Sequence, residues 1–112
     1  KKSMSFEKRL SESTKVLEKY PERVPIICQR SIHCKDIPII RKMKYLVPIH
    51  FSIGQFIHII RKRSDIKPEQ AIFVFVNNNI PPNSDSILTV YDKYKDKDGF
   101  LYITYSGENT FG

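Results

Sequence analysis

Apolar residues return along the chain with two different periods, and these periods predict where helices and strands lie. Between Phe6 and Tyr20 they recur at steps of three and four, as on one face of an amphipathic helix that ends at Pro21. Residues 23–30, RVPIICQR, alternate instead as a strand does, so that every second side chain faces the same side. The first 30 residues therefore predict a helix followed by a strand.

A second strand and a second helix are predicted from residue 44 to residue 63. The segment KYLVPI at 44–49 reads as a strand, and Pro48 places it at a sheet edge because proline has no N–H to donate. Ser52 and Gln55 form the signature of a capping box, which predicts that a helix begins there. Its apolar face runs out at 61–63, where cations suit the negative end of a helix.

The last third of the chain predicts two more strands and a short helix between them. AIFVFV at 71–76 is apolar throughout, which is typical of a strand buried on both faces. A short helix follows with Ser84 or Ser86 as its N-cap, and Asp98-Gly99 is typical of a turn into a final strand at 100–105.

This order predicts an α+β fold, the ubiquitin-like β-grasp with an N-terminal helical extension. In it a hairpin of two strands is followed by a crossover helix and then by further strands. We expect residues 1–22 to form the helical extension, 23–105 the β-grasp core, and 106–112 a flexible tail that ends in glycine.

Charge is distributed unevenly and predicts a basic face. The chain carries a net charge of +7, but residues 1–67 hold 16 Lys/Arg against 6 Asp/Glu, whereas 68–112 hold 3 against 6. Such a face attracts acidic peptides, anionic membranes or nucleic acid. Nucleic acid is not expected as a partner, because no RNP-type aromatic motif, GXXG loop or zinc finger accompanies the charge.

Neither a catalytic site nor a metal site is predicted. Cys28 and Cys34 are too few for a disulfide framework or a zinc site. His33 and Cys34 are adjacent in a loop, which rarely gives the geometry of nucleophilic catalysis. No apolar run approaches the roughly 18 residues that a membrane span needs, so a cytosolic chain is expected.

Several segments resemble the autophagy ubiquitin-like modifiers, the GABARAP and light-chain-three family. These segments are FEKR at 6–9, DIP at 36–38, KYLVP at 44–48, GQF at 54–56, IRKR at 60–63, AIFVFVNN at 71–78 and YKDKDGFLYITYSGENTFG at 94–112. The resemblance implies a modifier without a cofactor, which is a substrate of enzymes rather than an enzyme. It implies cytoplasmic localisation when free, and the autophagosomal membrane and the vacuole or lysosome when lipidated.

The resemblance also implies a role for Gly112. Its carboxylate would be activated by an activating enzyme, passed as a thioester to a conjugating enzyme and joined to phosphatidylethanolamine. In this family a cysteine protease usually removes any residues that follow the glycine. A glycine suits this chemistry because it has no side chain to obstruct a narrow enzyme channel.

The second implied activity is docking of autophagy receptors and adaptors through acidic peptides with an aromatic-x-x-aliphatic motif. An edge strand at 44–49 could accept such a peptide as an additional strand. By position, the aromatic pocket falls on Glu12, Val16, Pro25, Ile27, Lys44, Leu46 and Phe100. The aliphatic pocket falls on Tyr45, Val47, Pro48, Phe51, Phe56, Ile59 and Arg63. Arg23 and Lys42 are expected to contact the acidic residues of the peptide.

One alternative stays open at the level of sequence. The chain could be a non-conjugated adaptor that binds cytoskeleton, cargo or an anionic membrane through its basic face, since a fold does not by itself imply a function.

Overall fold

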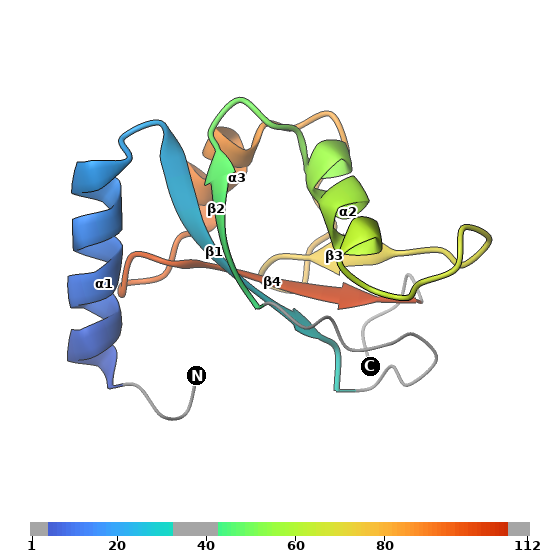
Figure 1. The fold of residues 1–112 in the computed structure, drawn as a ribbon, viewed down its shortest axis with the longest axis horizontal. Helices are drawn as coiled ribbons and strands as arrows, with labels where there is room; N and C mark the ends of the chain where they lie inside the picture. Colours follow the sequence, from blue (N-terminus) through green and yellow to red (C-terminus); the bar gives the residue numbers. More distant parts are fainter. Residues whose placement is uncertain (1–4, 33–42, 108–112) are drawn as a thin grey trace.

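The computed structural model describes residues 5–32 and 43–107, and these contain three helices and four strands (Figure 1). In chain order the elements are α1 (Phe6–Lys19), β1 (Arg23–Arg30), β2 (Lys44–Pro48), α2 (Ile53–Lys62), β3 (Phe73–Phe75), α3 (Ile87–Tyr94) and β4 (Leu101–Ser106). Within these ranges no helix is both long enough and apolar enough to cross a membrane.

The four strands form one mixed sheet in the order β2-β1-β4-β3. β1 runs antiparallel to β2 and parallel to β4, while β3 runs antiparallel to β4. A hairpin, a helix and a central last strand beside the first strand are the arrangement of the β-grasp. The predicted α+β ubiquitin-like fold is confirmed.

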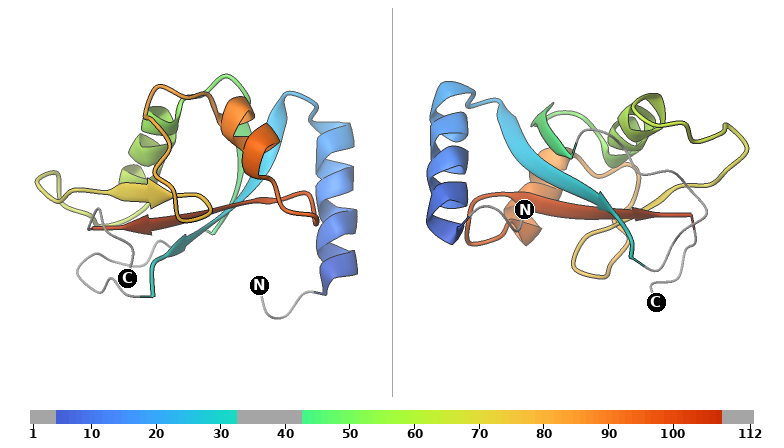
Figure 2. Two further views of the ribbon diagram at one scale, coloured as in Figure 1. Left: turned by 180° about the vertical axis from the view of Figure 1, so that it is seen from behind. Right: turned by 60° about the horizontal axis from the view of Figure 1, so that its bottom comes forward.

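Side chains of β2 alternate between the two faces of the sheet, and different helices lie on these faces. In β2 the side chains of Tyr45 and Val47 are buried, whereas those of Lys44 and Leu46 are exposed. Tyr45 packs edge-on against Phe56 of α2, with ring centroids 5.6 Å apart. The helix α1 stands apart from α2 and α3 at the other side of the sheet, as two further views show (Figure 2). The sheet therefore has a core face under α2 and α3 and a second face toward α1.

Helix starts follow the predicted capping chemistry. Ser52 accepts a hydrogen bond from the backbone N–H of Gln55, and the Gln55 side chain accepts one from the N–H of Ser52. This is a complete capping box, which satisfies N–H groups that would otherwise lack partners at the start of α2. Ser86 rather than Ser84 caps α3, because its hydroxyl accepts from the N–H of Thr89.

The strand predicted at 71–76 is shorter in the structure. β3 covers only Phe73–Phe75, and Phe73 is half-buried, so the prediction of a strand buried on both faces was wrong at this end. The chain turns at once after Phe75, with Asn77 and Asn78 at φ values of 51° and 65°. Hydrogen bonds between Val76 and Asn79 in both directions close this turn. The apolar run is therefore divided between a short edge strand and a hairpin turn.

Candidate functional site

The outer edge of β2 is the starting point of the site. Its partner β1 bonds to Met43 through the N–H of Cys28, and the N–H of Ile49 bonds to Glu22. Bonded pairs alternate in an antiparallel ladder, so with this register Tyr45 and Val47 direct their backbone groups toward β1. The backbone groups of Lys44 and Leu46 consequently point away from the sheet.

Pro48 ends this edge. It has no N–H, and its carbonyl oxygen accepts a hydrogen bond from the N–H of Phe51 at 3.1 Å. The outward-pointing part of β2 therefore consists of Lys44 and Leu46, and an added strand would have to pair there.

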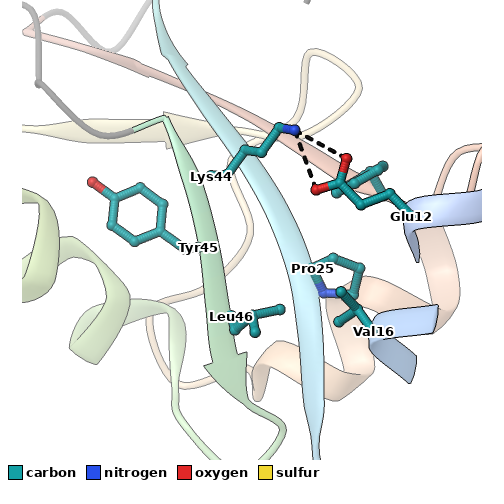
Figure 3. A pocket seen from close by; sticks show the side chains of 7 residues that line it. Glu12, Val16, Pro25, Lys44, Tyr45 and Leu46 are labelled. Atoms are coloured by element: carbon teal, nitrogen blue, oxygen red, sulfur yellow. Dashed lines mark hydrogen bonds and ion pairs between the residues drawn. The ribbon is translucent and has the colours of Figure 1, made fainter. Parts of the chain in front are cut away.

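A hollow of about 320 Å³ lies on the α1 face of this edge (Figure 3). Val16 from α1, Pro25 from β1 and Leu46 from β2 point toward one another across it. Leu46 is 38% exposed, although large apolar side chains are usually buried. The residues that line the hollow are Glu12, Val16, Pro25, Lys44, Tyr45, Leu46 and Phe100. An apolar floor of this size suits one aromatic side chain.

An ion pair crosses the first hollow. The Lys44 ammonium lies 3.1 and 3.2 Å from the two carboxylate oxygens of Glu12 (Figure 3). Both side chains remain well exposed, at 47% and 38%. Exposed pairs of this kind contribute only about 0–1 kcal/mol, so a ligand could rearrange this one at little cost.

A second hollow of about 240 Å³ lies between the β2 edge and α2. It is lined by Tyr45, Leu46, Val47, Pro48, Ile59, Lys62 and Arg63. Ile59 and the side chains of β2 supply apolar surface, while Lys62 and Arg63 add positive charge at its rim. The two hollows share Tyr45 and Leu46 but open on opposite faces of the sheet.

Three residues expected to line these pockets lie elsewhere. Ile27 is buried and is absent from the lining of the first hollow, although Pro25 on the same face lines it. Phe56 is fully buried in the core, and Phe51 is partly buried against the core. The resemblance assigned all three to the pockets by position. Burial removes Ile27 and Phe56 from the surface, whereas Phe51 keeps some exposure but is absent from the lining of the second hollow. Two other expected residues, Lys42 and Gly112, lie outside the described residues, as does the HCKDIP segment.

Lys62 and the paired state of Lys44 were not predicted. Lys62 belongs to the cationic run at the end of α2, for which the sequence alone indicates only a favourable interaction with the negative end of the helix. Since residues i and i+3 share a helix face, its spacing from Ile59 would have placed both beside the same hollow.

A buried polar cluster fixes the position of α1, which forms one side of the first hollow. The Asp98 carboxylate is fully buried and accepts hydrogen bonds from Arg9 Nε at 2.8 Å, from the Tyr102 hydroxyl and from the Phe100 N–H. The buried hydroxyl of Ser13 donates to the Asp98 carbonyl oxygen at 2.6 Å. Arg9 lies one turn before Glu12 in α1, and Ser13 lies between Glu12 and Val16. The cluster therefore sets where these two lining residues stand.

This cluster shifts the pKa values of its members. Burial alone would raise the pKa of Asp98, but hydrogen bonds from Tyr102, Phe100 and Arg9 outweigh it and hold that pKa below its ordinary value. Burial and the hydrogen bond to Asp98 raise the pKa of Tyr102. Asp98 is therefore ionised and Tyr102 neutral at neutral pH.

Cys28 has the environment of a core residue and not of a nucleophile. It is fully buried, and burial raises the pKa of its thiol. A nucleophilic cysteine needs a lowered pKa and access to substrate, so this thiol is inert.

The comparisons with known proteins agree with this architecture. The family described as "Autophagy protein Atg8 ubiquitin like" matches residues 8–112. The chain is 52% identical to Autophagy-related protein 8 of Schizosaccharomyces pombe, over 100% of this chain and 92% of that protein. It is 53% identical to the protein of the same name from Vanderwaltozyma polyspora, over 100% and 94%. The crystal structure of Trypanosoma brucei ATG8 superposes with a TM-score of 0.89 at 46% identity, covering 100% of this chain and 96% of that one.

Proposed function

This chain belongs to the Atg8 family of ubiquitin-like autophagy proteins, and from that membership we propose that it is a lipid-conjugated modifier that docks short acidic peptides. The autophagy role follows from the family. Attachment to phosphatidylethanolamine through Gly112 and docking of aromatic-x-x-aliphatic motifs at the β2 edge are the proposal.

The position of the two hollows on opposite faces of one strand edge is the observation that carries the docking proposal. A peptide that adds to β2 as a strand directs successive side chains to alternate faces. Two side chains whose positions in the peptide differ by an odd number therefore enter different hollows. An aromatic residue and an aliphatic residue three positions later satisfy this condition, and they lie about 10 Å apart in an extended chain.

Charge around the hollows supports an acidic peptide. Lys44 stands at the first hollow, and Lys62 and Arg63 stand at the second. Opposite charge steers encounter and selects partners, although each exposed pair adds little affinity.

The conjugation proposal concerns residues 107–112, which follow β4. The family match extends through Gly112. Six residues can span up to about 20 Å, enough to carry a carboxylate beyond the folded core. The proposed partners of this tail are the activating and conjugating enzymes of the pathway, and a cysteine protease where a precursor carries further residues. The free form would be cytoplasmic and the lipidated form would be on autophagosomal membranes and in the vacuole or lysosome.

Reconstitution tests the conjugation. The protein is incubated with the activating and conjugating enzymes of a related pathway, ATP and phosphatidylethanolamine vesicles. We expect a faster-migrating species that floats with the vesicles, and none from a variant that lacks Gly112. A variant with Leu46→Ala serves as a control, because it should be conjugated normally. Vesicle attachment that persists without Gly112 would refute the assignment of this residue.

The alternative is a non-conjugated adaptor acting through its basic face, and the charges of α1 do not favour the form of it in which that face lies on the N-terminal helix. α1 contains four Lys or Arg residues but also three Glu residues, and Arg9 is engaged by Asp98. The helix therefore presents mixed charge to solvent.

A further inference from the structure

Arg23 covers part of the β2 edge. It lies at the start of β1 opposite Pro48, and its guanidinium donates a hydrogen bond to the carbonyl oxygen of Leu46 at 3.3 Å. This carbonyl points away from β1, toward the side on which an added strand would lie. Leu46 is also the residue that both hollows share beside Tyr45. The guanidinium thus contacts the proposed docking edge at Leu46, next to the end that Pro48 closes.

We propose that Arg23 guards this edge and makes strand addition conditional on a carboxylate in the ligand. In the unbound protein its guanidinium donates a hydrogen bond to the Leu46 carbonyl oxygen. When a peptide pairs with β2 as an added strand, the guanidinium moves to an acidic residue of that peptide. This inference rests on the proposed docking of peptides at β2. It assigns to Arg23 a role in rejecting neutral peptides, in addition to attracting acidic ones.

The chemistry of the exchange favours acidic ligands. A peptide N–H that pairs with the Leu46 carbonyl competes with the guanidinium for the same outer side of the oxygen. A neutral peptide displaces Arg23 and leaves it only solvent. A carboxylate instead offers two oxygens in the geometry that guanidinium binds best, so the displaced group gains a stronger partner than the carbonyl it left.

The other cations of the site lack this position. Lys44 is held by Glu12 across the first hollow, and Arg63 lies on the α2 side of the edge. Arg23 also sits at the end that Pro48 closes, where a side chain can reach over the strand without blocking the hollow.

Calorimetry with two peptides tests the proposal. One peptide carries an aromatic-x-x-aliphatic motif with Asp residues on both flanks, and its match carries Asn at the same positions. Each is titrated into the wild type, into Arg23→Met, which keeps an apolar stem without donors, and into Lys8→Met. Lys8 is an exposed residue of α1 that lines neither hollow, so this control removes the same charge.

We expect Arg23→Met to bind the neutral peptide about threefold more tightly than the wild type does, which corresponds to one modest exposed hydrogen bond. The acidic peptide should bind Arg23→Met no more tightly than it binds the wild type, so the preference for acid falls. Lys8→Met should leave the affinity for the neutral peptide unchanged. Equal or weaker binding of the neutral peptide to Arg23→Met would overturn the guarding role.

A measurement without ligand separates this proposal from the docking proposal. The amide nitrogen of Val47 is bonded to the Leu46 carbonyl carbon, so its ¹⁵N chemical shift reports the hydrogen bond from Arg23. We expect this shift to move in Arg23→Met and to stay in Lys8→Met. If it moves but neither peptide binds the wild type, the docking function fails while the contact stands. If it does not move, the contact is absent and the guard is refuted.

Discussion

Ser13 donates a hydrogen bond to the carbonyl oxygen of Asp98 across 2.6 Å, although the two residues are separated by 85 positions in the chain. The contact fastens α1 to the turn that precedes β4. Both residues are buried, and Arg9 adds a second link to the same aspartate. Because α1 contributes Glu12 and Val16 to the first hollow, the shape of that hollow depends on this fastening.

Replacing Gly99 by alanine should loosen the fastening. A Cβ there would lie 2.2 Å from Ser13 Oγ, and Gly99 has a φ of 90°, which favours glycine. We expect the free energy of unfolding in urea to fall by at least about 2 kcal/mol. Gly54→Ala is the matched control, since its nearest new contact is 3.6 Å away and alanine favours the helix. Equal effects of the two substitutions would contradict this account.

The lowered pKa of Asp98 predicts a loss of stability in acid. In the window below the unfolded value of about 3.9, the unfolded chain binds more protons than the folded chain, so stability falls as the pH falls. The contribution is complete above that value and is lost as the pH drops through the folded pKa. Urea titrations between about pH 2 and about pH 6 should show a weaker pH dependence of stability in Asp98→Asn than in the wild type.

Leu46 and Tyr45 are neighbours in β2, yet their substitutions should have different effects. Leu46→Ala should weaken the binding of an acidic aromatic-x-x-aliphatic peptide by about 1–3 kcal/mol. It should leave folding intact, because the Leu46 side chain is exposed. Tyr45→Ala should instead cost about 3 kcal/mol of stability, because Tyr45 is only 6% exposed and packs on Phe56. Calorimetry and urea unfolding distinguish the two losses. Full affinity in Leu46→Ala would place the peptide elsewhere.

The spacing of the peptide motif should matter by parity. A peptide with one residue between the aromatic and the aliphatic side chain directs both to the same face, and only one hollow can be filled. We expect it to bind with the affinity of a peptide whose aliphatic residue is alanine. The two-residue spacer should bind more tightly than either. Indifference to spacing would show that the peptide does not add as a strand.

Salt should separate charge from packing. The exposed cations at the two hollows predict that binding of an acidic peptide weakens as salt rises toward 1 M, where the Debye length is about 3 Å. Apolar contacts are not screened in this way, so the loss caused by Leu46→Ala should persist. Affinities that stay constant from low to high salt would remove the basic rim from the docking surface.

Local patterns in the sequence predicted most of the fold. The capping box at Ser52 and Gln55 and the strand at residues 23–30 depend on neighbours a few positions apart, so both are visible in the chain itself. The edge position of β2 followed from Pro48, and the structure places β2 at one end of the sheet. Ser84 and Ser86 could not be distinguished, because both are small hydroxyl residues near the start of the same helix.

The parts that escaped prediction depend on contacts between distant segments. The sequence predicts Asp98 only as part of a turn, and nothing beside it in the chain indicates that it is buried against Arg9 and Ser13. The depth of a side chain has the same origin. Phe56 and Ile59 occupy one helix, but only the packing of α2 on the sheet decides that the first is interior and the second lines a hollow.

Pro48 limits how far a guest strand can slide. Pro48 itself has no N–H to donate, and its carbonyl oxygen already accepts a hydrogen bond from Phe51. A shift of one position would send every guest side chain to the wrong face, and a shift of two toward Pro48 would lose the backbone partner. In the proposed docking, the edge therefore accepts a short stretch of peptide in a single register. The same short edge offers a neighbouring copy few backbone groups to pair with, which limits edge-to-edge association of the open sheet.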